Sequence, residues 1–180
     1  DCLLSRGLGD VYKRQVVFIA LGSAISIIVG QQLGAGKLEE AVDTDRKMIV
    51  FSVFCCFVIG ACMFAIAPFF PRIYNTTEEV RGLAKQFIRI ASACMPLYGF
   101  MHATYFTLRS GGRTVITFLF DSVYIWVVDI PLAFVLTRFT GVPIVSIYLS
   151  CQLIEIIKCI IGYVMVKKKI WVNNMVMEQQ

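Results

Sequence analysis

The sequence predicts an all-α integral membrane protein with five transmembrane helices. The chain is 58% hydrophobic with a mean hydropathy of +0.74, and 16% of its 180 residues are charged, against roughly a quarter in soluble domains. A helix needs ~20 apolar residues to cross ~30 Å of hydrocarbon. Four such runs, and a shorter fifth at the front, fill nearly all of the chain from Val16 onward. Because no soluble core contains four such runs in a chain of this length, we expect transport or membrane scaffolding.

The first span is expected over residues 16–34. Residues 1–15 are polar and glycine-bearing, and they lack the cleavage site and apolar core of a signal peptide. This string resembles a spurious translated tag, so we expect the fold to begin at Val16. The alternative is a genuine segment that leads into the first helix.

Small residues recur every four positions along this first span, at Gly22, Ser26, Gly30 and Gly34. Four residues advance an α-helix by slightly more than one turn, so these positions form a slanted stripe. In lipid such a stripe lets a neighbouring helix backbone approach closely. The alternative is a hinge or a groove that lines a substrate path.

The second span is expected over residues 48–70, after a charged connection at 35–47 that includes the start of the helix. Pro68 and Pro71 end it. Thr76 and Glu79 have capping-box spacing, which predicts that the third helix begins near Thr77. That helix is expected to run to Arg109, to cross the membrane over 88–109, and to be kinked by Pro96, which frees a backbone carbonyl.

Glycines around Gly111 separate the third span from the fourth, which is expected over 115–137 with a kink at Pro131. The fifth span is expected over 143–166. Three lysines at 167–169 then stop transfer, and Trp171 suits the membrane interface. Residues 171–180 are expected to form a cytoplasmic tail.

Basic residues lie between the spans and give the orientation. Eight of them fall on one side of the predicted membrane and four on the other, and the richer side is expected in the cytoplasm. The chain then ends inside, in the plasma (inner) membrane of a cell that we expect to be bacterial. An odd number of spans indicates part of a longer polypeptide. The positive charge therefore serves topology, and no nucleic-acid partner is expected.

Cysteine and motif patterns exclude several classes of function. Seven cysteines show no metal-ligand spacing, and all but Cys2 lie in apolar runs, where free cysteine packs as a small hydrophobe. No metalloprotease, nucleophile-elbow or phosphate-loop motif is present. We therefore expect no enzyme, no metal and no cofactor.

Ionisable residues inside the spans are the candidate transport site, because such residues usually face a bundle interior or a watery cavity. Glu155 and Lys158 are three apart, so they neighbour each other on one helix face, either as an internal ion pair or as a cavity pair. Asp129 is either a cavity acid or a residue near a helix end. His102 is either a titrating group or a packing hydrogen-bonder. Asp121 is expected to be structural, and Arg109 to reach toward the headgroups.

Two motifs resemble those of the multidrug and toxic compound extrusion (MATE) family. Residues 30–36, GQQLGAG, followed by Glu40-Ala41, resemble the family's GQxLGAG…EA signature, in which Gln31 is the motif glutamine. Residues 108–114, LRSGGRT, resemble its LRGxGDT turn, and Asp121, Trp126 and Pro131-Leu132-Ala133 follow as in the next family helix. The resemblance covers residues 16–170. It implies helices 8–12 of a twelve-helix, two-lobed transporter, and hence a partial C-terminal lobe.

The resemblance further implies cation-coupled efflux of amphipathic organic cations by alternating access, driven by Na⁺ or H⁺. Its implied partners are membrane lipid, the missing N-terminal lobe of the same polypeptide, and small organic cations. Two departures stand out. Arg113 replaces an aspartate of the family turn, and residues 96–99, PLYG, carry no acid where some members hold a cation-site carboxylate.

Two other functions remain open at this stage. A related flippase for lipid-linked sugars would need more in-span arginine and lysine, whereas here in-span acids outnumber in-span bases three to one. A membrane scaffold or subunit would transport nothing.

Overall fold

The computed structural model describes residues 2–69, 77–112, 114–139 and 141–172, and only the backbone of residues 2–15. The described residues form helices and turns, without a strand. The helices are α1 (Cys2–Gly34), α2 (Leu38–Ile66), α3 (Glu78–Ser110), α4 (Thr114–Phe118), the π-helical turns η2 (Leu119–Val123) and η3 (Ile125–Asp129), α5 (Ile130–Phe139) and α6 (Ile144–Lys167).

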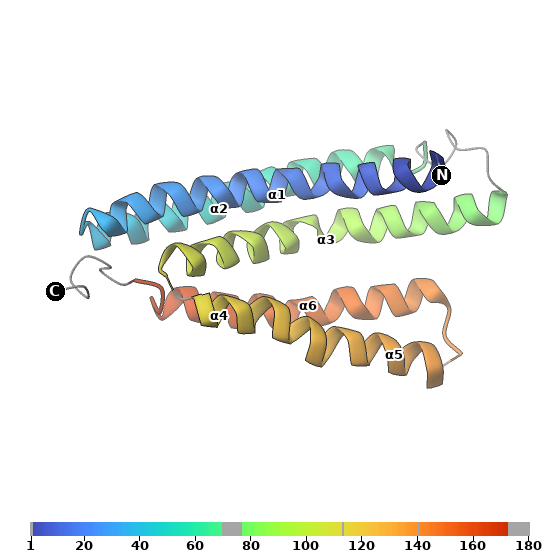
Figure 1. Ribbon diagram of the computed structural model, residues 1–180. Coiled ribbons are helices and arrows are strands. Elements are labelled where there is room, and N and C mark those ends of the chain that lie inside the picture. The colour runs from blue at the N-terminus through green and yellow to red at the C-terminus, as the bar shows by residue number, and fades with distance from the viewer. Residues whose placement is uncertain (1, 70–76, 113, 140, 173–180) are drawn as a thin grey trace.

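The helices lie side by side in a flat stack (Figure 1). The α1–α2 hairpin forms one layer, the continuous run from α4 to α5 forms another with α6, and α3 lies between them and contacts both. The helix axes are nearly parallel or antiparallel to one another, as those of spans in one membrane are. We name the end that holds Lys37, Arg46, Arg109 and Lys167 the basic end.

Helix boundaries agree closely with the predicted spans, with two exceptions. α1 continues through residues 2–15, although we expected the fold to begin at Val16. α2 ends at Ile66 rather than at residue 70. Ala67 keeps helical φ and ψ, but Pro68 has no N–H to continue the helical hydrogen bonds. Thr77 caps α3 in an extended conformation without a side-chain bond. Thr76, Pro71, Arg113 and the tail beyond Val172 lie outside the described residues.

By length and composition, four described helical segments could cross a membrane, over Val16–Gly34, Leu38–Ile66, Val115–Phe139 and Ile144–Lys167. The remaining predicted span, over 88–109, lies in α3, which is 33 residues long but more polar. Its polar side chains are buried against other helices rather than in lipid, as at Ser92, Thr104 and Thr107. A helix at the centre of the stack needs less apolar surface than one that faces lipid.

In the small-residue stripe of α1, Gly22 packs closely, since an added Cβ would lie 2.1 Å from the Phe106 ring. Among the described residues nothing lies within 4 Å of such an atom at Gly30 or Gly34, so no described helix packs closely there. The buried face of α1 instead runs through Ile25, Val29 and Leu33, each 0% exposed. Because a four-residue step drifts around the helix, a stripe that starts at Gly22 turns away from this face.

The basic end is closed by the turn after α6. Trp171 is 1% exposed and belongs to the same apolar cluster as Leu33, Ala41 and Leu108. Its backbone carbonyl oxygen lies 2.0 Å from where a Cβ on Gly111 would be, so Gly111 is needed for space. The prediction that Trp171 lies at the lipid interface is therefore wrong, because the turn folds it under the bundle.

Candidate functional site

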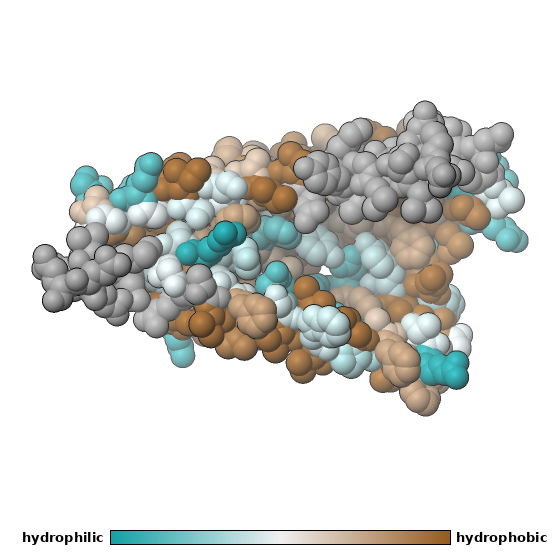
Figure 2. Space-filling model, viewed as in Figure 1, coloured by the Kyte–Doolittle hydropathy of each residue, from teal (hydrophilic) through white to brown (hydrophobic). Residues whose placement is uncertain are grey.

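A polar cavity of about 190 Å³ opens between α1, α3, η2 and α6. Its ionisable lining residues are His102, Tyr105, Asp121 and Lys158. Figure 2 shows hydrophilic side chains gathered between the two layers, whereas apolar side chains cover the outer flank of α4 and α5. The polar groups thus face the interior of the stack, as expected for charges in a membrane protein.

An ion pair joins two helices at this cavity. Lys158 Nζ on α6 lies 2.8 Å from Asp121 Oδ1 on η2, and the Lys158 side chain is 4% exposed while that of Asp121 is 46% exposed. The ammonium also lies 5.5 Å and 5.6 Å from the ring centres of Phe120 and Tyr124. A carboxylate and two aromatic faces together stabilise a cation that has left water.

The ion pair that forms joins Lys158 to Asp121 rather than to Glu155, and the expectation that Asp121 is structural stays a prediction. The i,i+3 spacing does put Glu155 near Lys158, but Lys158 reaches across to the neighbouring helix. The Glu155 carboxyl group lies close to that of Asp129. The remaining oxygens, Asp129 Oδ1 and Glu155 Oε2, are buried without a partner among the described residues.

Both aspartates lie on π-helical turns, which often occur at functional sites. Asp121 is in η2, and Asp129 is the last residue of η3. The Ile130 N–H bonds to the Ile125 carbonyl, five residues back, and Pro131 has no N–H to continue the α-helical pattern. The π-helical turns therefore come just before Pro131, where we predicted a kink. They also set the rotation of the helix that turns Asp121 toward α6.

His102 makes one hydrogen bond through a ring nitrogen, and its ring packs against α1. Its Nδ1 lies 3.0 Å from the Tyr98 carbonyl oxygen, and the ring stacks on Phe18 at 4.8 Å. Because a carbonyl can only accept, Nδ1 carries the hydrogen. The ring thus packs against α1 as a hydrogen-bonding group and also lines the cavity beside Asp121 and Lys158, and its role as a titrating group stays a prediction.

Two polar contacts beside the cavity were not predicted. The Tyr98 hydroxyl donates to Gln152 Oε1, which links α3 to α6. The Tyr124 hydroxyl donates to the Ile154 carbonyl oxygen at 2.8 Å, which links the π-helical turns to α6. The tyrosine hydroxyl groups and the glutamine amide carry no charge at neutral pH, so a search for charged residues in the spans does not find these contacts.

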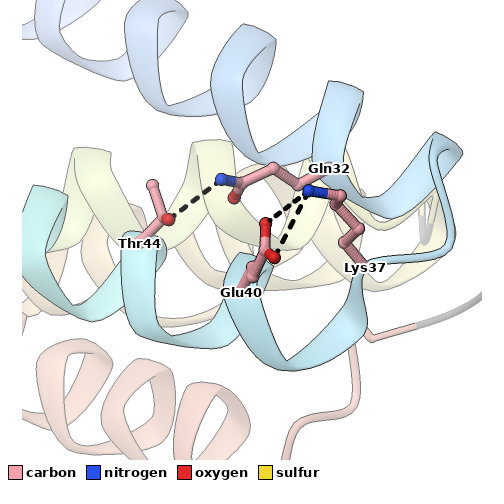
Figure 3. A network of polar contacts seen from close by, with 4 residues as sticks. All are labelled: Gln32, Lys37, Glu40 and Thr44. Carbon is pink, nitrogen blue, oxygen red and sulfur yellow. Dashed lines mark hydrogen bonds and ion pairs between the residues drawn. The ribbon is translucent and has the colours of Figure 1, made fainter.

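The first motif builds the turn between α1 and α2 (Figure 3). Gln32 Nε2 donates to Thr44 Oγ1 at 3.1 Å across the hairpin, and Lys37 Nζ donates to Glu40 Oε2 at 3.0 Å. Gly36 has a φ of 75°, which explains a glycine there. Gln31, the motif glutamine, is exposed. Of the two glutamines in the motif, Gln32 rather than Gln31 therefore makes the hydrogen bond across the hairpin.

A second buried polar contact lies near the basic end. Thr107 Oγ1 on α3 donates to Asp45 Oδ1 on α2 at 2.6 Å, and Asp45 is 1% exposed. We did not single out Asp45. The signal was its place in the buried face of α2, between Ala41 and Ile49 at four-residue steps.

Within the described residues, no group of three His, Cys, Asp or Glu side chains converges as a metal site would require. Arg109 is exposed at the end of α3, where we expected it to reach toward the headgroups.

The comparison with protein families identifies the chain. The sequence model of the MatE family matches residues 15–135, about two thirds of the chain. This protein belongs to the MatE family. The match covers the first motif, the second motif and both aspartates of the π-helical turns, so the cavity described above lies largely within the part that defines the family.

Two relatives carry multidrug resistance in their names. The chain is 23% identical over 140 residues to the probable multidrug resistance protein YoeA of Bacillus subtilis, covering 76% of this chain and 29% of that protein. It is 25% identical over 130 residues to the probable multidrug resistance protein NorM of Oceanobacillus iheyensis, covering 68% of this chain and 28% of that protein. The chain thus aligns with less than a third of each relative. No solved structure matches it.

Proposed function

We propose that this MatE chain forms five spans of the C-terminal lobe of a multidrug efflux antiporter. The transporter would export amphipathic organic cations, coupled to Na⁺ or H⁺, by alternating access between two lobes. Family membership and the names of both relatives support efflux of this kind. Transporters built from repeated halves hold their substrate near the midplane between them.

The observation that carries this proposal is the charge balance of the interior. Asp121, Asp129 and Glu155 lie on two facing segments, and Lys158 is the base beside them. The ring faces of Phe120 and Tyr124 already hold an ammonium group. The same chemistry suits an organic cation, whose charge needs an acid and whose body needs aromatic contact.

The Asp129–Glu155 pair is the proposed acceptor for the coupling ion. The two carboxyl groups lie close together, and each keeps a buried oxygen without a hydrogen-bond partner among the described residues. Either a proton or a Na⁺ ion satisfies these oxygens, so the coupling ion is left as Na⁺ or H⁺. The other proposed components are the surrounding lipid of a bacterial plasma membrane and the opposing lobe.

A chimera tests the proposal. The segment of the Oceanobacillus NorM protein that aligns with this chain is replaced by this chain, and ethidium efflux is followed in cells. We expect the chimera to export ethidium, the chain alone to match the empty vector, and Asp121→Asn to reduce export by the chimera. Glu79→Gln is the matched control, because it also removes one carboxylate but lies at the exposed start of α3.

Efflux by the chain alone would contradict the need for a second lobe. A chimera that reaches the membrane in normal amount and exports nothing, while the parent NorM protein exports ethidium, would contradict the assignment as an efflux lobe.

A further inference from the structure

A second and larger cavity, of about 510 Å³, lies at the basic end, away from the polar cavity. Its walls come from the first turns of α2, the end of α6 and the turn after α6. Binding cavities for small ligands span roughly 300–1,000 Å³. Neither the family match nor the proposed efflux reaction assigns a role to it.

Three basic side chains line this cavity: Arg46 on α2, Lys167 at the end of α6, and Lys169 in the turn. Lys169 has a φ of 53°, a left-handed conformation that folds the chain back under the bundle. One acid, Asp45, is also in the wall, but it is buried and accepts the hydrogen bond from Thr107. The open charge of the cavity is therefore positive.

A buried donor without an acceptor gives a second, independent observation. Trp171 lines the cavity and is 1% exposed, and its indole Nε1 is buried with no hydrogen-bond partner among the described residues. Leaving such a donor unsatisfied costs about 1–3 kcal/mol, so buried donors are nearly always paired. An indole N–H can only donate, so the missing partner is an acceptor.

The rest of the lining is mostly apolar. It includes Val50, Val53 and Phe100, and Val50 is 64% exposed. Tyr163, on α6, carries Lys167 Nζ over its ring at 5.8 Å. A soluble anion would use the basic rim and leave this apolar wall empty. A lipid uses both, because its phosphate meets the rim and its acyl chain follows the helices.

We propose that this cavity binds one anionic phospholipid. On binding, the turn after α6 shifts so that Trp171 Nε1, which is buried in the structure, opens to the cavity. The phosphate then accepts from this N–H and pairs with Arg46, Lys167 and Lys169, and one acyl chain lies along the groove between α2 and α6. Basic pockets between transmembrane helices on the cytoplasmic side suit anionic headgroups. The bound lipid would supply the acceptor that Trp171 lacks and would join α2 to α6 where the turn after α6 closes the bundle.

Native mass spectrometry of the full purified chain in detergent tests this proposal. The probe is an equimolar mixture of dioleoyl phosphatidylglycerol and dioleoyl phosphatidylcholine. We expect one retained phosphatidylglycerol per chain. Trp171→Phe, which keeps the ring and removes the donor, should lower its apparent affinity about fivefold to tenfold, and Arg46→Gln should lower it by a similar factor. Circular dichroism shows whether each variant keeps its helices.

Lys47→Gln is the matched control. Lys47 lies next to Arg46 at the same end, but it is exposed and pairs with Asp43 rather than lining the cavity. We expect this variant to bind phosphatidylglycerol as the unchanged chain does. Equal losses in the Arg46→Gln and Lys47→Gln variants would overturn the proposal, because they would show diffuse attraction to a basic surface.

Two further outcomes would overturn it. Equal retention of the two lipids would show no anionic site, and complete displacement of phosphatidylglycerol by inorganic phosphate would show an anion site without a lipid requirement. A chain truncated after Val172 addresses the remaining rival occupant, residues 173–180. Lipid binding that appears only after truncation would mean that this tail fills the cavity.

Discussion

At the scale of single residues, the ionisable groups of the interior lie in two pairs, and each pair joins residues from different helices. Lys158 pairs with Asp121 from another helix, and Glu155 pairs with Asp129. An isolated charge in a membrane costs several kcal/mol, so pairing allows four ionisable groups to share one region. The sequence sufficed to pick out all four, because a charge in an apolar run is conspicuous. It did not suffice to pair them, because the register of Asp121 depends on π-helical turns that residue spacing does not reveal.

A double-mutant cycle would measure the pairing. We expect Asp121→Asn to destabilise the chain by roughly 1–3 kcal/mol, less than for a fully buried pair, because the Asp121 side chain is half exposed. Adding Lys158→Met should recover most of this loss, since the stranded ammonium is removed. The measurement is the midpoint of unfolding in increasing detergent denaturant, followed by circular dichroism.

The same cycle with Glu155→Gln serves as the comparison. If Lys158 couples to Glu155 more strongly than to Asp121, the local i,i+3 pair is the important one, and the pairing seen here does not govern stability.

At the scale of elements, α2 and α3 approach closely where a proline leaves a carbonyl free. Pro96 has no N–H for the Ser92 carbonyl four residues earlier, and a Cβ added to Gly60 of α2 would lie 2.7 Å from that carbonyl oxygen. The facing Gly99 of α3 is equally tight, with Cys56 Sγ at 2.7 Å from an added Cβ. Two glycines therefore let the two helices meet around the proline.

We expect Gly60→Ala to destabilise the chain by about 1–3 kcal/mol, because an added methyl group in a filled interface forces the backbones apart. Gly82→Ala is the control, since nothing lies within 4 Å of a Cβ there and alanine favours the helix by up to about 1 kcal/mol. Thermal unfolding in detergent compares the two variants. A Gly60→Ala variant as stable as Gly82→Ala would show that the α2–α3 interface has room to spare.

Sequence patterns predicted the elements better than their contacts. Hydropathy placed the spans, and prolines and glycines placed the turns, because both act locally. The stripe of small residues in α1 meets a described helix closely at Gly22 but not at Gly30 or Gly34, since the partner helix decides which face is buried. Trp171 was misassigned for the same reason: its aromatic ring suits a lipid interface, but the left-handed turn at Lys169 directs it under the bundle. The cavity beside Trp171 depends on that turn and was not predicted.

At the scale of the whole molecule, the helices lie along nearly the same axis (Figure 1), and one end carries more lysines and arginines than the other. The basic end collects the α1–α2 turn, the end of α3 and the end of α6. The opposite end, which includes the turn between α5 and α6, has fewer lysines and arginines. Such a bias sets the orientation of a multi-pass protein at the membrane.

Reporter fusions would measure this orientation. In a Gram-negative host, we expect green fluorescent protein fused after Gln180 to fluoresce, because it stays in the cytoplasm. Alkaline phosphatase inserted at Gly141, between α5 and α6, should be active, because it reaches the periplasm. The reverse pattern at both sites would show that the basic end faces outward and would remove the cytoplasmic setting of the second cavity.

The polarity of α3 has a consequence for how the protein is made. A nascent helix that is apolar enough leaves the translocation channel sideways into lipid as soon as it is synthesised, whereas α3 is absent from the helices that meet this standard on their own. Its buried threonines and serines would then contact hydrocarbon until a partner covers them. We therefore expect α3 to enter the bilayer already paired with α2, so that insertion and helix pairing become one event at the channel.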